Sequence, residues 1–112
     1  MKSLAVLALA LVLALALATA ALGATTTVKV ADNYFVRDGG VSEVKVRRGD
    51  VVSWRFAGLR AHSVVVKRGP EPFGSGPRSS GSYPHRMKKI GTYTIYCGIH
   101  GARMQMRLIV KR

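Results

Sequence analysis

The chain has 112 residues, of which 18 are Lys or Arg and five are Asp or Glu, giving a formal net charge of +13 at pH 7. This length is enough for one small domain and excludes a large multidomain enzyme. The only cysteine is Cys97, so an internal disulfide and a lipid anchor on an N-terminal cysteine are both excluded.

Residues 1–24 have the pattern of a secretory signal peptide. One basic residue precedes an unbroken apolar stretch over residues 4–18, and small residues follow it. Cleavage is expected after Ala20 or after Ala24. The alternative is an uncleaved membrane anchor, because a spanning helix needs about 20 apolar residues. We therefore predict an exported protein of the periplasm or cell surface, with residues 25–112 as its folded domain.

The predicted domain, residues 25–112, keeps 17 basic and all five acidic residues, so its net charge is about +12. Such a charge bears on partners and solubility rather than on the fold. Nucleic acid is not an expected partner of an exported protein. We expect an acidic protein surface, an anionic membrane surface or an envelope polyanion instead.

The same domain is predicted to be all-β, with about seven or eight strands. Apolar residues recur at every second position in each of these segments, and β-branched and aromatic residues are frequent. Turns rich in glycine and charged residues separate the segments, as expected for an antiparallel sandwich or barrel. In chain order, the alternating segments are 28–30, 44–46, 52–56, 64–66, 93–97 and 106–110.

Residues 68–81 interrupt this pattern. They hold three of the four prolines, together with several glycines and serines. A linker between two domains is one interpretation. The pieces on either side are too small to fold alone, so an internal surface loop is preferred.

Four side chains form a candidate metal site. Cys97 ends one predicted strand, His100 lies in the following turn, and Met104 begins the next strand with inward parity. His62 lies in a separate apolar segment. One thiolate, two imidazoles and one thioether are the donor set of a blue-copper site. Copper ligation would also explain a lone thiol in an oxidising compartment.

The chain resembles the cupredoxins of the plastocyanin type over essentially all of residues 25–112. Residues 28–35 and 44–54 resemble the opening strands and the Gly-Asp turn of that family. Ala61-His62-Ser63-Val64-Val65 resembles its first ligand segment, and residues 91–100 resemble its second. The resemblance implies a Greek-key β-sandwich with one type 1 copper at its end. Carried over by position, it implies His62, Cys97 and His100 as equatorial ligands and Met104 as the axial ligand.

Two departures from the plastocyanin pattern concern the ligand region. Three residues separate His100 from Met104, where the family has four, and the residue five positions past His100 is Gln105. Glutamine can also serve as an axial ligand, so Met104 is favoured over an open alternative. Ser63 stands where asparagine is common. Of the other candidates, Met106 is expected in the core and His85 on the surface.

These observations favour a monomeric one-electron carrier that cycles between Cu(II) and Cu(I) and is not an enzyme. His100 would be the site of electron exit, and redox partners with acidic docking surfaces are expected. A copper-handling protein without electron-transfer duty is the alternative. A Cys/His pair can act as nucleophile and base, but a sandwich of this size offers little substrate pocket. Adhesion to an envelope polyanion by charge alone is a further possibility.

Overall fold

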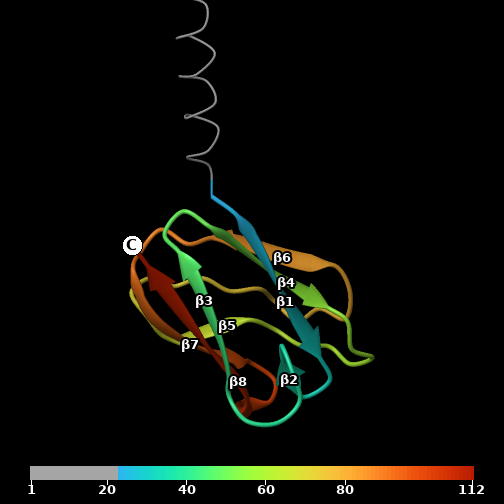
Figure 1. Ribbon diagram of the computed structural model, residues 1–112. Helices are drawn as coiled ribbons and strands as arrows, with labels where there is room; N and C mark the ends of the chain where they lie inside the picture. The colour runs from blue at the N-terminus through green and yellow to red at the C-terminus, as the bar shows by residue number, and fades with distance from the viewer. Residues whose placement is uncertain (1–22) are drawn as a thin grey trace, which may run out of the picture.

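The computed structural model describes residues 23–112 (Figure 1). The predicted signal peptide falls almost wholly on residues 1–22, outside this described part. Within residues 23–112 the chain forms eight strands in two four-stranded sheets, which confirms the predicted all-β sandwich. Nowhere in this part does a helix reach the length and hydropathy required to span a bilayer.

The two sheets take their strands from both halves of the chain. The first sheet has the order β2 (Tyr34–Phe35), β1 (Thr25–Ala31), β4 (Val51–Phe56) and β6 (Ser82–Arg86). The second has the order β3 (Ser42–Arg47), β8 (Gly101–Lys111), β7 (Gly91–Cys97) and β5 (Val65–Arg68). The chain changes sheet repeatedly between β2 and β7, in the manner of a Greek-key sandwich.

The expected antiparallel arrangement does not hold for two strand pairs. β1 pairs with β4 in parallel, with Val28 opposite Trp54, and β3 pairs with β8 in parallel, with Val44 opposite Leu108. Parallel neighbours cannot be joined by a tight hairpin and need a long connection. Here each connection includes at least one strand of the other sheet, and both sheets combine parallel and antiparallel pairs.

The core lies between the sheets and follows the alternation in the sequence. On each long strand every second side chain is buried, because successive side chains of a strand point to opposite faces. Met106 is among the buried residues, as predicted. From the central strands, the core contains Val28, Val30, Val52, Trp54, Phe56, Tyr93, Ile95, Met106, Leu108 and Val110.

The proline- and glycine-rich segment between β5 and β6 packs beside the residues that precede β5. His62 and Arg78 exchange backbone hydrogen bonds of 2.9 and 2.8 Å. Further along, the Ser75 N–H donates to the Val64 carbonyl, and the Ser75 hydroxyl accepts the Val64 N–H. These contacts fix the backbone at His62 and at Val64, two residues further on.

The sandwich has two distinct ends. One carries the start of β1, the β3–β4 turn and the C-terminus, and the opposite end carries β2 and the turn from β7 into β8 (Figure 1). The residues proposed as metal ligands lie at the second end, where β7 stops and β8 begins.

Candidate metal centre

Cys97 and His100 are held by one short turn. β7 ends at Cys97 and β8 begins at Gly101, and the register of the pair shifts between Tyr96 and Cys97. Irregularities of this kind redirect a side chain at the end of a ladder. Gly101 has a φ of 64°, which favours glycine. The resulting turn places His100 Nδ1 3.4 Å from the Cys97 sulfur.

His62 reaches the same place from the segment before β5. Its side chain is fully buried, and its Nδ1 lies 3.9 Å from Cys97 Sγ. The rings of His62 and His100 have centroids 5.1 Å apart. The three donor atoms all lie within 4.8 Å of one another. A transition metal bonds nitrogen and sulfur at about 2.0–2.3 Å, so one ion fits between donors at this separation.

Asp32, in the turn after β1, orients His62. Its Oδ1 lies 2.9 Å from His62 Nε2, and its two oxygens also accept the backbone N–H groups of Leu59 and Arg60. The hydrogen bond from His62, followed by those two N–H groups, lowers the Asp32 pKa to about 2. An ionised carboxylate only accepts hydrogen bonds, so His62 Nε2 carries the proton. The lone pair of a neutral His62 is therefore on Nδ1, which faces the sulfur.

The environment of Cys97 favours its thiolate. Burial raises the thiol pKa, but hydrogen bonds from the Ser63 N–H, the His100 side chain and the backbone N–H groups of His100 and Ile99 outweigh it. The net effect lowers the pKa of Cys97 to about 6. The thiolate is the form that binds a metal. Amides that point at the sulfur therefore prepare it for ligation.

Ser63 and Gly98 connect the two ligand segments. The Ser63 hydroxyl accepts the Gly98 N–H at 2.8 Å, which ties the residue after His62 to the residue after Cys97. A Cβ on residue 98 would lie 2.8 Å from that hydroxyl and 3.2 Å from Val65 Cγ2. The approach of the two segments therefore requires glycine at this position.

Met104 and Gln105 occupy opposite faces of β8. Met104 is buried and shares the inward parity of Met106, as predicted. Gln105 is partly exposed, and its side-chain amide donates to the Ala102 carbonyl at 3.2 Å. Of the two sequence candidates, only Met104 therefore belongs to the face that packs toward the core.

The structure corrects the expectation for His85. Its side chain is only 24% exposed, its ring stacks on Phe73 at a centroid distance of 4.1 Å, and Nε2 lies 3.3 Å from Glu71 Oε1. The residue is absent from the donor cluster, as expected, but it is half-buried rather than exposed. Phe73 and Glu71 lie in the irregular segment, and their positions could not be predicted from local patterning.

Asp32 is the functional residue that the sequence analysis did not identify. It lies thirty positions before His62, and no motif links the two. The only local signal is an aspartate immediately after an apolar strand, in Val30-Ala31-Asp32-Asn33. Many turns have an aspartate there, so this signal does not by itself indicate a histidine partner.

No protein-family model and no curated protein sequence matches the chain. Solved structures do match. A purple cupredoxin from Nitrosopumilus maritimus has a TM-score of 0.65 and 20% identity, covering 77% of this chain and 99% of that one. An amicyanin variant in the Cu(I) form also has a TM-score of 0.65 and 20% identity, with coverages of 78% and 82%.

A Cu-containing nitrite reductase from Thermus scotoductus matches with a TM-score of 0.64 and 22% identity. The match covers 79% of this chain but only 22% of the reductase, so the chain is similar to one part of that protein. All three relationships are structural, and their identities are too low to carry more than the fold. Combined with the mixed two-sheet topology, they show that residues 25–112 adopt the cupredoxin fold.

Proposed function

We propose that the protein is a small exported type 1 copper protein that carries single electrons between redox partners and has no enzymatic activity of its own. The observation that supports this proposal best is the buried convergence of His62, Cys97 and His100 at one end of a cupredoxin fold. The donor set, one sulfur and two imidazole nitrogens, is typical of a copper electron-transfer site.

His62, Cys97 and His100 would hold the copper, and Met104 would be a fourth, weaker ligand. Copper, when bound, supplies a one-electron couple between Cu(II) and Cu(I). The inward position of Met104 supports its choice over Gln105, whose amide is engaged with the Ala102 carbonyl.

The chain's own residues hold the donors in place before any metal arrives. Asp32 fixes the ring of His62, backbone amides fix the Cys97 sulfur, and Ser63 joins the two ligand segments. A donor set held by its surroundings moves little when the charge at the site changes. Little movement means a small reorganisation on electron transfer, which suits a carrier.

His100 is the proposed point of electron exit. It is the least buried of the three donors, and the turn that carries it exposes apolar surface. Ile99 is 53% exposed, and Leu59, beside Arg60 in the β4–β5 connection, is 96% exposed. An apolar contact around the donor edge would allow a partner to approach without trapping charged groups.

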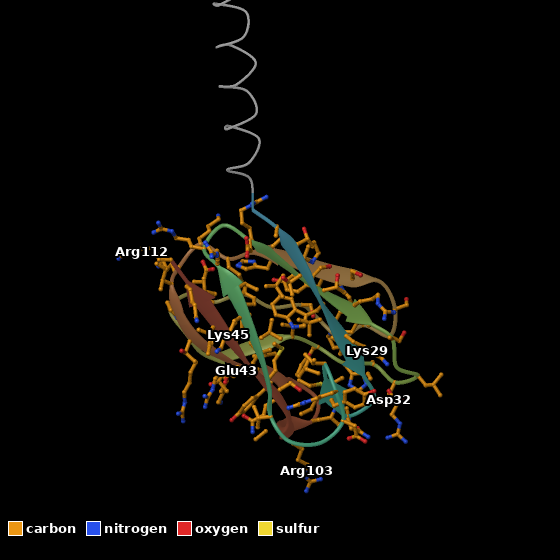
Figure 2. The ribbon with its side chains drawn as sticks, viewed as in Figure 1. Lys29, Asp32, Glu43, Lys45, Arg103 and Arg112 are labelled. Atoms are coloured by element: carbon orange, nitrogen blue, oxygen red, sulfur yellow. The ribbon has the colours of Figure 1, made fainter. Side chains whose placement is uncertain are left out.

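The surface near this end would favour acidic partners. Arg60 follows Leu59 directly, and Arg103 follows the ligand turn; both are exposed. Figure 2 shows Arg103 at this end. Basic side chains beside an apolar contact steer a negatively charged partner toward it. We propose that the protein acts as a monomer in the periplasm or at the cell surface.

A titration with Cu(II) tests the copper site. Purified protein should develop an intense visible sulfur-to-copper charge-transfer band and a type 1 EPR signal at one copper per chain. Cys97→Ala should abolish the band, whereas His85→Ala, which removes a histidine outside the donor cluster, should leave it unchanged. A colourless wild-type protein would overturn the proposal.

The rate of copper release separates the carrier from a copper-handling protein. A carrier should keep its ion through many redox cycles, so transfer of copper to a strong chelator should be far slower than reduction by a small electron donor. Release as fast as electron transfer would favour copper handling.

A further inference from the structure

The end of the sandwich opposite the copper ligands carries a dense cluster of cations, which we call the basic end. Among the described residues it comprises seven exposed side chains from β3, β6, β8 and the adjoining turns: Arg47, Arg48, Arg86, Lys88, Lys89, Lys111 and Arg112. Arg47 lies opposite Lys111 in the β3–β8 pair, and the Arg48 N–H donates to the Lys111 carbonyl at 2.7 Å.

Hydrogen bonds bring the β6–β7 connection to the same end. The Gly49 N–H donates to the Met87 carbonyl at 2.7 Å, and the Met87 N–H donates to the Asp50 carbonyl at 2.8 Å. The Arg86 guanidinium donates to the Gly49 carbonyl at 2.7 Å. Lys88 and Lys89 follow Met87 directly, so they lie beside the β3–β4 turn.

Two carboxylates lie at this end, and both are occupied by internal hydrogen bonds. Asp50 accepts the backbone N–H groups of Ala24 and Arg47. Glu71 accepts the Lys88 N–H and lies 3.3 Å from the His85 ring nitrogen. Seven cations and two such carboxylates leave a net charge of +5, concentrated on one end of a small domain.

The chain also enters the domain at the basic end. The Ala24 N–H donates to Asp50 Oδ1 at 3.0 Å, and the Val51 N–H donates to the Ala24 carbonyl at 2.8 Å. A side chain on Gly23 would collide with the Gly49 carbonyl, so the backbone passes directly over the β3–β4 turn. The apolar sequence of residues 4–22 therefore joins the domain beside these cations.

The proposed copper ligands lie at the other end. In Figure 2, Arg112 is near the start of β1, whereas Arg103, three residues after His100, is at the far end with Asp32. A surface in contact with the basic end would leave His100 and the exposed Ile99 accessible from the opposite side.

We propose that the basic end binds the anionic headgroup surface of a lipid bilayer and orients the domain with its ligand turn away from the membrane. Each Lys or Arg near such a surface adds to the attraction. Ile90, 41% exposed and next to Lys89, adds an apolar contact at the same place. The attachment of the apolar residues 4–22 here favours a membrane over an acidic protein, and the cations act whether or not that segment is removed.

Vesicle binding tests the proposal without copper, so its result does not depend on the proposed electron-carrier function. All eight described strands and the whole described core lie within residues 25–112, so this segment carries its own hydrophobic core. We expect it to bind vesicles that contain phosphatidylglycerol and to bind pure phosphatidylcholine vesicles far more weakly. Added salt should weaken the first interaction.

Matched charge variants locate the surface. Replacing Arg48, Lys88, Lys89 and Arg112 with Gln should reduce the vesicle partition coefficient on the order of 100-fold. The control replaces four exposed cations elsewhere, Lys29, Arg37, Arg55 and Lys67, and should reduce it by no more than about five-fold, since these lie off the contact surface. Thermal unfolding of both variants establishes that they are folded.

Three outcomes would overturn the proposal. Equal losses in the two variants would mean that total charge rather than the basic end drives binding. Equal binding to neutral and anionic vesicles would exclude headgroup recognition. Binding of a soluble polyanion such as heparin through the basic end, without binding to vesicles, would assign the surface to an envelope polymer.

NMR with a paramagnetic headgroup lipid tests the orientation. In anionic vesicles or nanodiscs that contain a gadolinium-chelating lipid, amides of Arg48, Lys89 and Arg112 should broaden strongly. Amides of Ile99 and Gly101 should be spared, because they lie in the ligand turn. Equal broadening at both ends would contradict the proposed orientation even if the domain binds.

Discussion

The Asp32 carboxylate lies 2.9 Å from Nε2 of the buried His62 and fixes the direction of that ring. Both residues lie in connections between strands, Asp32 between β1 and β2 and His62 between β4 and β5. A candidate ligand in one connection is thus held by a carboxylate in another. Carboxylate–histidine pairs of this kind orient metal ligands and strengthen their basicity.

Removing this carboxylate should weaken copper binding. Asp32→Ala frees the His62 ring and leaves the Leu59 and Arg60 N–H groups without their acceptor. We expect copper affinity, measured by competition with a chelator, to fall about 10- to 100-fold. Asp38→Ala, a carboxylate in the nearby exposed loop, should have no such effect. Equal affinities for Asp32→Ala and wild type would show that Asp32 does not position the ligand.

The axial ligand can be assigned by potentiometry. Met104→Leu keeps a buried apolar side chain of similar volume, so the cost in stability should stay below about 1.5 kcal/mol. The reduction potential should rise, because loss of a donor weakens the more highly charged Cu(II) more than Cu(I). Met106→Leu and Gln105→Ala should leave the potential close to wild type. A shift in Gln105→Ala alone would instead assign the amide as the ligand.

Acid should destabilise the apoprotein partly through Asp50. Hydrogen bonds from the Arg47 N–H and then the Ala24 N–H hold the Asp50 pKa below its ordinary value of 3.8. A lowered folded-state pKa stabilises the fold above that ordinary value, and the contribution is lost as pH falls from about 4 through the folded-state pKa. The Asp50→Asn variant should lose roughly 1 kcal/mol at neutral pH.

Urea denaturation at neutral pH and near pH 3 measures this effect. Asp50→Asn should lose less stability than wild type on acidification, because the group that titrates is gone. Glu43→Gln, which removes an exposed carboxylate paired with Lys45 and Arg107, should keep nearly all of the acid sensitivity. The interpretation would be wrong if Asp50→Asn and wild type lost equal stability.

Association with an acidic redox protein should depend on charges near the ligand turn. Arg60→Glu combined with Arg103→Glu should slow bimolecular electron transfer about 10-fold or more at low ionic strength, and salt should reduce the difference. Stopped-flow reduction of the copper-loaded protein provides the measurement. Arg48→Glu combined with Lys89→Glu makes the same change in net charge at the basic end and should slow transfer much less. Equal slowing would reject local steering.

The sequence predicted local features of the fold and site well. Alternation in segments such as 93–97 and 106–110 identified strands and their inward faces, because a strand's period of two is visible in a single segment. Cys97, His100 and Met104 could be identified as one candidate cluster because a short turn connects their strands. The period of two in each strand also predicts which of its side chains point inward. His62 was included because the donor set needs a second imidazole and because it lies in an apolar segment, and the family resemblance supported the choice; its Nδ1 lies 3.9 Å from the sulfur.

Features that depend on distant segments could not be predicted. The parallel pairing of β1 with β4 depends on how the chain crosses between sheets, which no single segment encodes. The stacking of His85 on Phe73 and the hydrogen bond between Asp32 and His62 join residues far apart in sequence. Each of these residues looks like an ordinary turn or surface residue until tertiary contacts are known.

The pairing of β8 with β7 beyond the register shift at Cys97 determines which side chain of β8 faces the donor cluster. Met104 and Gln105 are consecutive on β8 and face opposite sides. If the downstream pairing of β7 with β8 is kept, deleting one residue between His100 and Met104 would leave Met104 and Gln105 on their present faces. A slip of β8 by one residue against β7 would instead exchange the two faces. The Gln105 amide would then point inward and the Met104 thioether outward. The strand pairing that follows the turn therefore selects which of the two donors faces the cluster.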